Sequence, residues 1–105
     1  MTTSPPASDP KTVDRKTVRV AITGRVQGVW YRSWTIQEAT VRGLSGWVRN
    51  RHDGSVEALF SGTTAQVDAM VLACHTGPKA ARVAGVEVFQ TEDLVAEGFK
   101  ELPTT

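Results

Sequence analysis

The residues best suited to chemistry lie in one stretch, Thr23-Gly24-Arg25-Val26-Gln27-Gly28-Val29-Trp30-Tyr31-Arg32. Gly24 and Gly28 bracket three residues, so the backbone can turn tightly and direct several N–H groups toward one point. Arg32 adds a planar guanidinium whose fixed donors fit two oxygens of a phosphate or a carboxylate. These residue types at this spacing predict an anion-binding loop.

The elements that must position this loop follow from the hydrophobic pattern on either side of it. Val18, Val20 and Ile22 alternate with polar or small residues, which is the period of a half-buried strand. Residues 32 to about 42 have the composition of a helix. A helix that starts there would direct its unpaired N–H groups and the positive end of its dipole at the loop. The loop is therefore predicted between a strand and the start of a helix.

The rest of the chain predicts a second unit of similar kind. Strands are predicted at residues 44–50, 55–61 and 82–89, and Gly98 to Leu102 as a short edge strand. Residues 63–66 resemble a capping box. Four apolar residues then follow the spacing of a core-facing helical stripe: Val67, Met70, Val71 and Cys74. The order βαββαβ predicts an α/β (α+β) sandwich of ferredoxin-like type, a four-stranded antiparallel sheet with two helices on one face.

This topology brings a second polar residue toward the loop. Right-handed crossovers make the first and second strands run in the same direction. The loop after the first strand and the end of the second strand then share one edge of the sheet. We expect Arg32 and Asn50, which a whole helix separates in sequence, to be neighbours there. Without that context, Arg32 would be a solvated residue of a first helical turn, and Asn50 a turn residue.

Composition restricts the class of protein. The chain of 105 residues suffices for one modest core, with residues 1–15 predicted as a disordered tail and 16–105 as the folded domain. A net charge of +1 does not indicate binding to nucleic acid or to an anionic membrane. Cys74, the single cysteine, is predicted as a core thiol and favours a cytoplasmic protein. His52 and His75 lack partners at ligand spacing, so both are predicted as surface residues and not as metal ligands.

Two separate motifs give the chain a resemblance to a known family. Residues 22–32 resemble the first signature of the acylphosphatase family. Gly46-Trp47-Val48-Arg49-Asn50, followed by Gly54-Ser55-Val56 and Gly62, resembles the second. The chain departs from the family's pattern at Tyr31, where Phe or Met is usual, and at Arg51, where many members carry a smaller polar residue.

The resemblance implies a ferredoxin-like fold and an enzyme that hydrolyses the carboxyl–phosphate bond of acyl phosphates without a metal or a cofactor. Arg32 matches the family's phosphate-binding arginine, and Asn50 matches its water-positioning asparagine. The matching phosphate loop supplies backbone N–H groups from Arg25, Val26, Gln27, Gly28, Val29, Trp30 and Tyr31. A small acyl phosphate is then the expected partner, a phosphate or sulfate ion is expected to fit the same site, and we expect a monomer.

Three other classes fit part of the pattern less well. RNA-recognition domains share this element order but carry stacking aromatics on a central strand, whereas the third predicted strand here has Glu57 and one aromatic residue, Phe60. Non-catalytic acylphosphatase-like domains, as in hydrogenase maturation proteins, belong to much larger chains. A nucleoside triphosphatase is disfavoured because the chain has no Gly-x-x-x-x-Gly-Lys-Ser/Thr loop.

Overall fold

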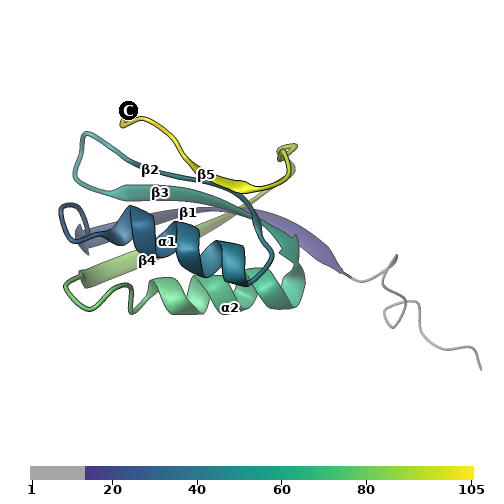
Figure 1. Ribbon diagram of the computed structural model, residues 1–105, viewed down its shortest axis with the longest axis horizontal. Coiled ribbons are helices and arrows are strands. Elements are labelled where there is room, and N and C mark those ends of the chain that lie inside the picture. Colours follow the sequence, from purple (N-terminus) through teal and green to yellow (C-terminus); the bar gives the residue numbers. More distant parts are fainter. Residues whose placement is uncertain (1–13) are drawn as a thin grey trace, which may run out of the picture.

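The structure, a computed structural model, describes residues 14–105 as two helices on one face of a sheet (Figure 1). The elements are β1 (Arg15–Arg25), α1 (Tyr31–Val41), β2 (Ser45–Asn50), β3 (Val56–Thr63), α2 (Thr64–Cys74), β4 (Arg82–Thr91) and β5 (Phe99–Glu101). The ferredoxin-like architecture predicted from the sequence is confirmed. Residues 1–13 of the predicted tail lie outside the described residues. Arg15, placed in that tail by its polar surroundings, is instead the first residue of β1, because its backbone pairs with Thr63.

The order of the strands confirms the direction argument and corrects the strand number. The sheet runs β4-β1-β3-β2-β5. β1 and β2 both pair antiparallel to β3, so they run in the same direction. The four-stranded antiparallel sheet becomes a five-stranded mixed one, because β5 pairs in parallel with β2, with Val48 opposite Glu101. A strand of three residues is too short for its alternation to indicate which neighbour it joins.

The predicted apolar stripes meet between the sheet and the helices. Val18, Val20 and Ile22 of β1 are buried, and so are Tyr31, Thr35 and Ala39 of α1. On α2 the buried residues are Val67, Met70 and Cys74, while Val71 is partly buried. The predicted capping box starts α2: the Gln66 N–H donates to Thr63 Oγ1 (3.1 Å), and the Thr63 N–H donates to Gln66 Oε1 (3.0 Å).

A β-bulge shifts the register of β1 against β4 just before the predicted anion-binding loop. Thr23 pairs with Gly85, but Gly24 pairs with Val83, so the register shifts by one residue there. Gly24 has a φ of 117°, and a Cβ on it would lie 2.3 Å from the carbonyl oxygen of Arg82. Only glycine fits this approach of the two strands. The bulge therefore lies two residues before the end of β1, where the chain leaves the sheet.

Glu57 forms ion pairs with three arginines on the face of the sheet that the helices leave uncovered. Its carboxylate lies 2.8 Å from Arg49 Nε, 3.0 Å from Arg51 Nη1 and 3.5 Å from Arg19 Nη1. Burial raises the pKa of Glu57, but the hydrogen bonds from Arg49 and Arg51 outweigh it and hold the pKa below its ordinary value. Arg49 and Arg51, which flank Asn50, are therefore bound to a buried carboxylate and are not free, solvated charges.

Candidate active site

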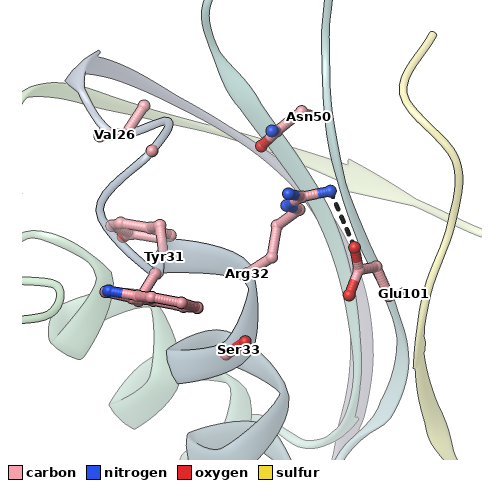
Figure 2. A pocket seen from close by; sticks show the side chains of 8 residues that line it. Val26, Tyr31, Arg32, Ser33, Asn50 and Glu101 are labelled. Carbon is pink, nitrogen blue, oxygen red and sulfur yellow. Dashed lines mark hydrogen bonds and ion pairs between the residues drawn. The ribbon is translucent and has the colours of Figure 1, made fainter.

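A cavity of about 210 Å³ lies where the start of α1, the end of β2 and β5 meet. Both residues that the topology predicts to be neighbours, Arg32 and Asn50, line this cavity, and Figure 2 shows their side chains side by side. The complete lining is Val26, Gly28, Trp30, Tyr31, Arg32, Ser33, Asn50 and Glu101. The structure therefore brings together the predicted anion-binding loop and the residue expected from the second motif.

The loop presents backbone donors to this cavity. Gly28 has a φ of 73°, in the left-handed region, so the chain reverses there. The backbone hydrogen bonds described for turns and loops over residues 14–105 include none donated by the N–H groups of residues 27–30. Trp30, the N-cap of α1, makes no side-chain capping bond, and the first turn has no acidic residue. The start of α1 thus keeps the unpaired N–H groups that suit an anion.

The side chain of Gln27 fixes the loop to the segment after Asn50. Its Nε2 donates to the carbonyl oxygen of Arg51 (2.7 Å) and to that of Ser55 (2.8 Å). On either side of Gln27, Val26 and Val29 are buried in the core. The loop and the β2–β3 turn are therefore held as one unit.

Tyr31 anchors the first residue of α1 and, through the backbone, Arg32. Its hydroxyl donates to the carbonyl oxygen of Cys74 (2.6 Å), which satisfies the polar group at this departure from the family pattern. Burial raises the pKa of Tyr31 far above its ordinary value. Gly77 makes room for the ring, because a Cβ there would lie 2.6 Å from Tyr31 Cε2.

Arg32 points into the cavity and is paired with a carboxylate from β5. Its Nη1 lies 2.8 Å from Glu101 Oε2 (Figure 2), and the two side chains are 36% and 44% exposed. Sequence reasoning missed Glu101 because no motif includes it. It also missed Ser33, whose only signal is its place in the first turn of α1.

Asn50, the last residue of β2, carries an unusual polar atom. Its Oδ1 is buried and accepts no hydrogen bond from any residue in the described range 14–105. A buried acceptor without a partner costs about 1–3 kcal/mol. Its backbone, by contrast, is satisfied, because its carbonyl accepts from the Thr105 N–H (3.1 Å). The backbone of Asn50 is therefore fixed at the cavity, while its Oδ1 remains able to accept a hydrogen bond.

Comparison with known proteins identifies the family. The family model described as Acylphosphatase matches residues 18–100. The chain belongs to the acylphosphatase family. An acylphosphatase of Rhodospirillum rubrum is 52% identical over 89 residues, which cover 85% of this chain and 98% of that protein. One of Rhizorhabdus wittichii is 47% identical over 91 residues, covering 87% and 92%. The resemblance seen in the sequence, and the hydrolase class, are confirmed.

Solved structures agree with this membership of the acylphosphatase family. The acylphosphatase of Bacillus subtilis has a TM-score of 0.78 and 34% identity, covering 82% of this chain and 97% of that one. The acylphosphatase of Coxiella burnetii has a TM-score of 0.82 and 26% identity, covering 85% and 94%. Full-length HypF has a TM-score of 0.80 and 22% identity, covering 87% of this chain and 12% of that one. At this identity the likeness shows only that the two chains share a fold.

The other residues singled out by the sequence lie as follows. Arg25 ends β1 opposite Arg82 and is exposed, and the side chains of Arg25, Gln27 and Val29 do not line the cavity. Cys74 is buried, and His52 and His75 are exposed, as predicted. Among residues 14–105, no three His, Cys, Asp or Glu residues are grouped to hold a metal ion. None of the helices there has the length and hydropathy to span a membrane.

Proposed function

We propose that this chain hydrolyses acyl phosphates, with the phosphoryl group bound by Arg32 and the loop N–H groups and the attacking water oriented by Asn50. The observation that carries the proposal is the unpartnered Oδ1 of Asn50, buried in the same cavity as the Arg32 guanidinium. A primary amide offers an acceptor and donors, enough to fix the direction of one water. Arg32 and the start of α1 supply the charge and the donors that an oxyanion needs.

The reaction follows from these roles. The water oxygen attacks phosphorus, the bond from phosphorus to the carboxyl oxygen breaks, and its electron pair leaves with the carboxylate. The proton released by the water passes to a phosphoryl oxygen, which yields inorganic phosphate. A carboxylate leaving group has a pKa near ~4, so no general acid has to protonate it. Catalysis then consists of positioning and of stabilising charge on the equatorial oxygens, which Arg32 and the N–H groups can do.

Two observations favour this proposal over the alternatives raised by the sequence. The match covers 98% of the Rhodospirillum rubrum acylphosphatase but only 12% of full-length HypF, so the matched region corresponds to nearly the whole of a protein named as an acylphosphatase. Phe60, the aromatic residue of β3, is buried in the core against Phe99, so it cannot stack on a nucleic-acid base. A small acyl phosphate is the proposed substrate, inorganic phosphate or sulfate is proposed to fit the same site, and the protein is proposed to act as a monomer.

Hydrolysis of benzoyl phosphate and acetyl phosphate by the full chain, with a chelator present, tests the proposal. We expect Arg32→Ala to lose phosphate affinity and turnover together, by the 10²–10³-fold (roughly 2.7–4 kcal/mol) typical of removing an oxyanion partner. Asn50→Ala should mainly lower turnover while inorganic phosphate still binds. Arg42→Ala is the matched control, because it removes an arginine that pairs with Glu38 at the other end of α1.

Each part of the proposal has its own refutation. If the wild-type chain hydrolyses neither acyl phosphate, the proposed function is wrong. An Asn50→Ala enzyme with full turnover would remove the water-positioning role. If Arg42→Ala lost as much activity as Arg32→Ala, the effect would be one of general charge or folding and not of the cavity.

A further inference from the structure

The side chain of Trp30 is a part of the cavity that hydrolysis as described does not use, since only the loop N–H groups bind the phosphoryl group. Trp30 is 79% exposed, yet it lines the cavity together with Arg32. The other exposed large hydrophobic residues described lie outside this cavity: Val41, Leu72, Val88, Phe89 and Leu94. Trp30 therefore places a large apolar surface at the rim of the candidate active site with nothing covering most of it.

The local backbone does not explain why a tryptophan stands at this position. Trp30 has a φ of 68°, and no other non-glycine residue of the described chain has a positive φ. A bulky residue is unfavourable in this left-handed conformation, which glycine or asparagine adopts more readily. Trp30 also makes no side-chain capping bond to α1. Neither burial, nor turn formation, nor capping therefore accounts for the indole.

The geometry of the proposed reaction places the acyl leaving group on the side of the cavity where Trp30 lies. In an in-line displacement, the leaving group lies on the side of the phosphorus opposite the attacking water. Asn50, which orients that water, comes from the end of β2, whereas Trp30 precedes Arg32 at the start of α1. Figure 2 shows Asn50 on the strand side of the cavity and Tyr31, the next residue after Trp30, on the helix side. The acyl group then extends away from Asn50, toward the exposed rim.

We propose that Trp30 contacts the acyl group, so that the preferred substrates are acyl phosphates with an aromatic or a bulky apolar acyl group. This inference rests on the proposed function of the site. An aromatic acyl group can cover one face of the indole, whereas the methyl group of an acetyl covers little of it. Covering such a face supplies about a tenfold difference in binding.

Binding of two phosphonates to the full chain tests this inference without turnover. Phenylphosphonate and methylphosphonate carry a carbon–phosphorus bond in place of the hydrolysed one and differ in the group that would meet Trp30. Calorimetry gives their two dissociation constants and hence a ratio, from which any effect common to both ligands cancels. In the wild type we expect phenylphosphonate to bind about tenfold more tightly.

Two variants and one control separate the indole from the loop backbone. Trp30→Asn removes the ring and tolerates a positive φ, so it should bring the ratio close to one. Trp30→Phe keeps an aromatic face and should retain most of the preference. Trp47→Leu removes an aromatic residue that stacks on Arg49, outside the cavity, and should leave the ratio as in the wild type. The ratio of kcat/KM for benzoyl phosphate to that for acetyl phosphate should follow the same pattern.

The outcomes distinguish this inference from the proposed function. Equal binding of the two phosphonates to the wild type, or a preference that Trp30→Asn retains, overturns the role of Trp30 and leaves hydrolysis untouched. If the wild type binds neither phosphonate nor inorganic phosphate, the phosphate site itself is wrong, and the inference fails with it.

Discussion

Glu101→Gln should make the site bind inorganic phosphate more tightly. Glu101 lies 2.8 Å from Arg32, so a bound phosphoryl group would share that guanidinium with a carboxylate of like charge. Two unit charges about 5 Å apart repel by roughly 1–3 kcal/mol for effective dielectric constants from 80 down to 20. Since both side chains are more than a third exposed, we take about 1.4 kcal/mol, which is about tenfold in the dissociation constant.

Calorimetric titration of inorganic phosphate into the wild type and Glu101→Gln measures this difference directly. Glutamine keeps the shape of the side chain and a hydrogen-bond acceptor for Arg32, so the substitution removes mainly the charge. Glu38→Gln is the control, because it removes a carboxylate paired with Arg42, away from the cavity. The gain should shrink as salt rises, since ions screen half-exposed charges.

The opposite result would refute this reasoning. If Glu101→Gln binds phosphate more weakly than the wild type, Glu101 serves to hold Arg32 in place and does not compete with the ligand. A gain of the same size in Glu38→Gln would show that the net charge of the protein, and not the pair at Arg32, controls binding.

Two more substitutions test the supports of the site. Gln27→Ala removes the bonds to the carbonyls of Arg51 and Ser55, so we expect about 1–2 kcal/mol less stability in urea and weaker phosphate binding by calorimetry; unchanged binding would mean that the loop holds itself. Burial raises the pKa of the Cys74 thiol from 9.0 to about 12, so as the pH rises this thiol ionises in the unfolded chain before it does in the folded chain. The free energy of unfolding therefore keeps the contribution of the buried thiol below about pH 9 and has lost about 1.4 kcal/mol of it at pH 10. Buried Tyr31 should add to the loss above its ordinary pKa of 10.0. Urea unfolding at pH 7 and pH 10 should show that Cys74→Ala loses less free energy of unfolding between the two pH values than the wild type does. An equal loss in the two proteins would mean that the Cys74 thiol does not contribute to this pH dependence.

The sequence predicted the parts of the site that depend on local pattern and on topology. Strand alternation, two glycines and a helix start are local features, and they located the loop. The handedness of the crossovers placed Arg32 beside Asn50 without any side-chain detail. Both steps use rules that hold whatever the exact packing, which is why they succeeded.

The parts that failed depend on how side chains meet across the sheet. Arg49 lies directly opposite Glu57 in the β2–β3 pairing, so its partner follows only from the exact register of the hairpin. The side-chain bonds of Gln27 depend on the shape of the β2–β3 turn, which the sequence does not specify. Glu101 reaches Arg32 because β5 joins β2, and three residues of strand carry too little pattern to predict that pairing.

The C-terminal segment beside β2 makes contact with both halves of the candidate site. Glu101 pairs with Arg32, and the Thr105 N–H donates to the carbonyl of Asn50 (3.1 Å). This segment is attached through an edge strand of only three residues, and such margins open at a lower free energy than the centre of a sheet. Warming the protein should therefore loosen the candidate site before the core unfolds, so that an activity assay would report the local stability of this sheet edge and not the global stability of the fold.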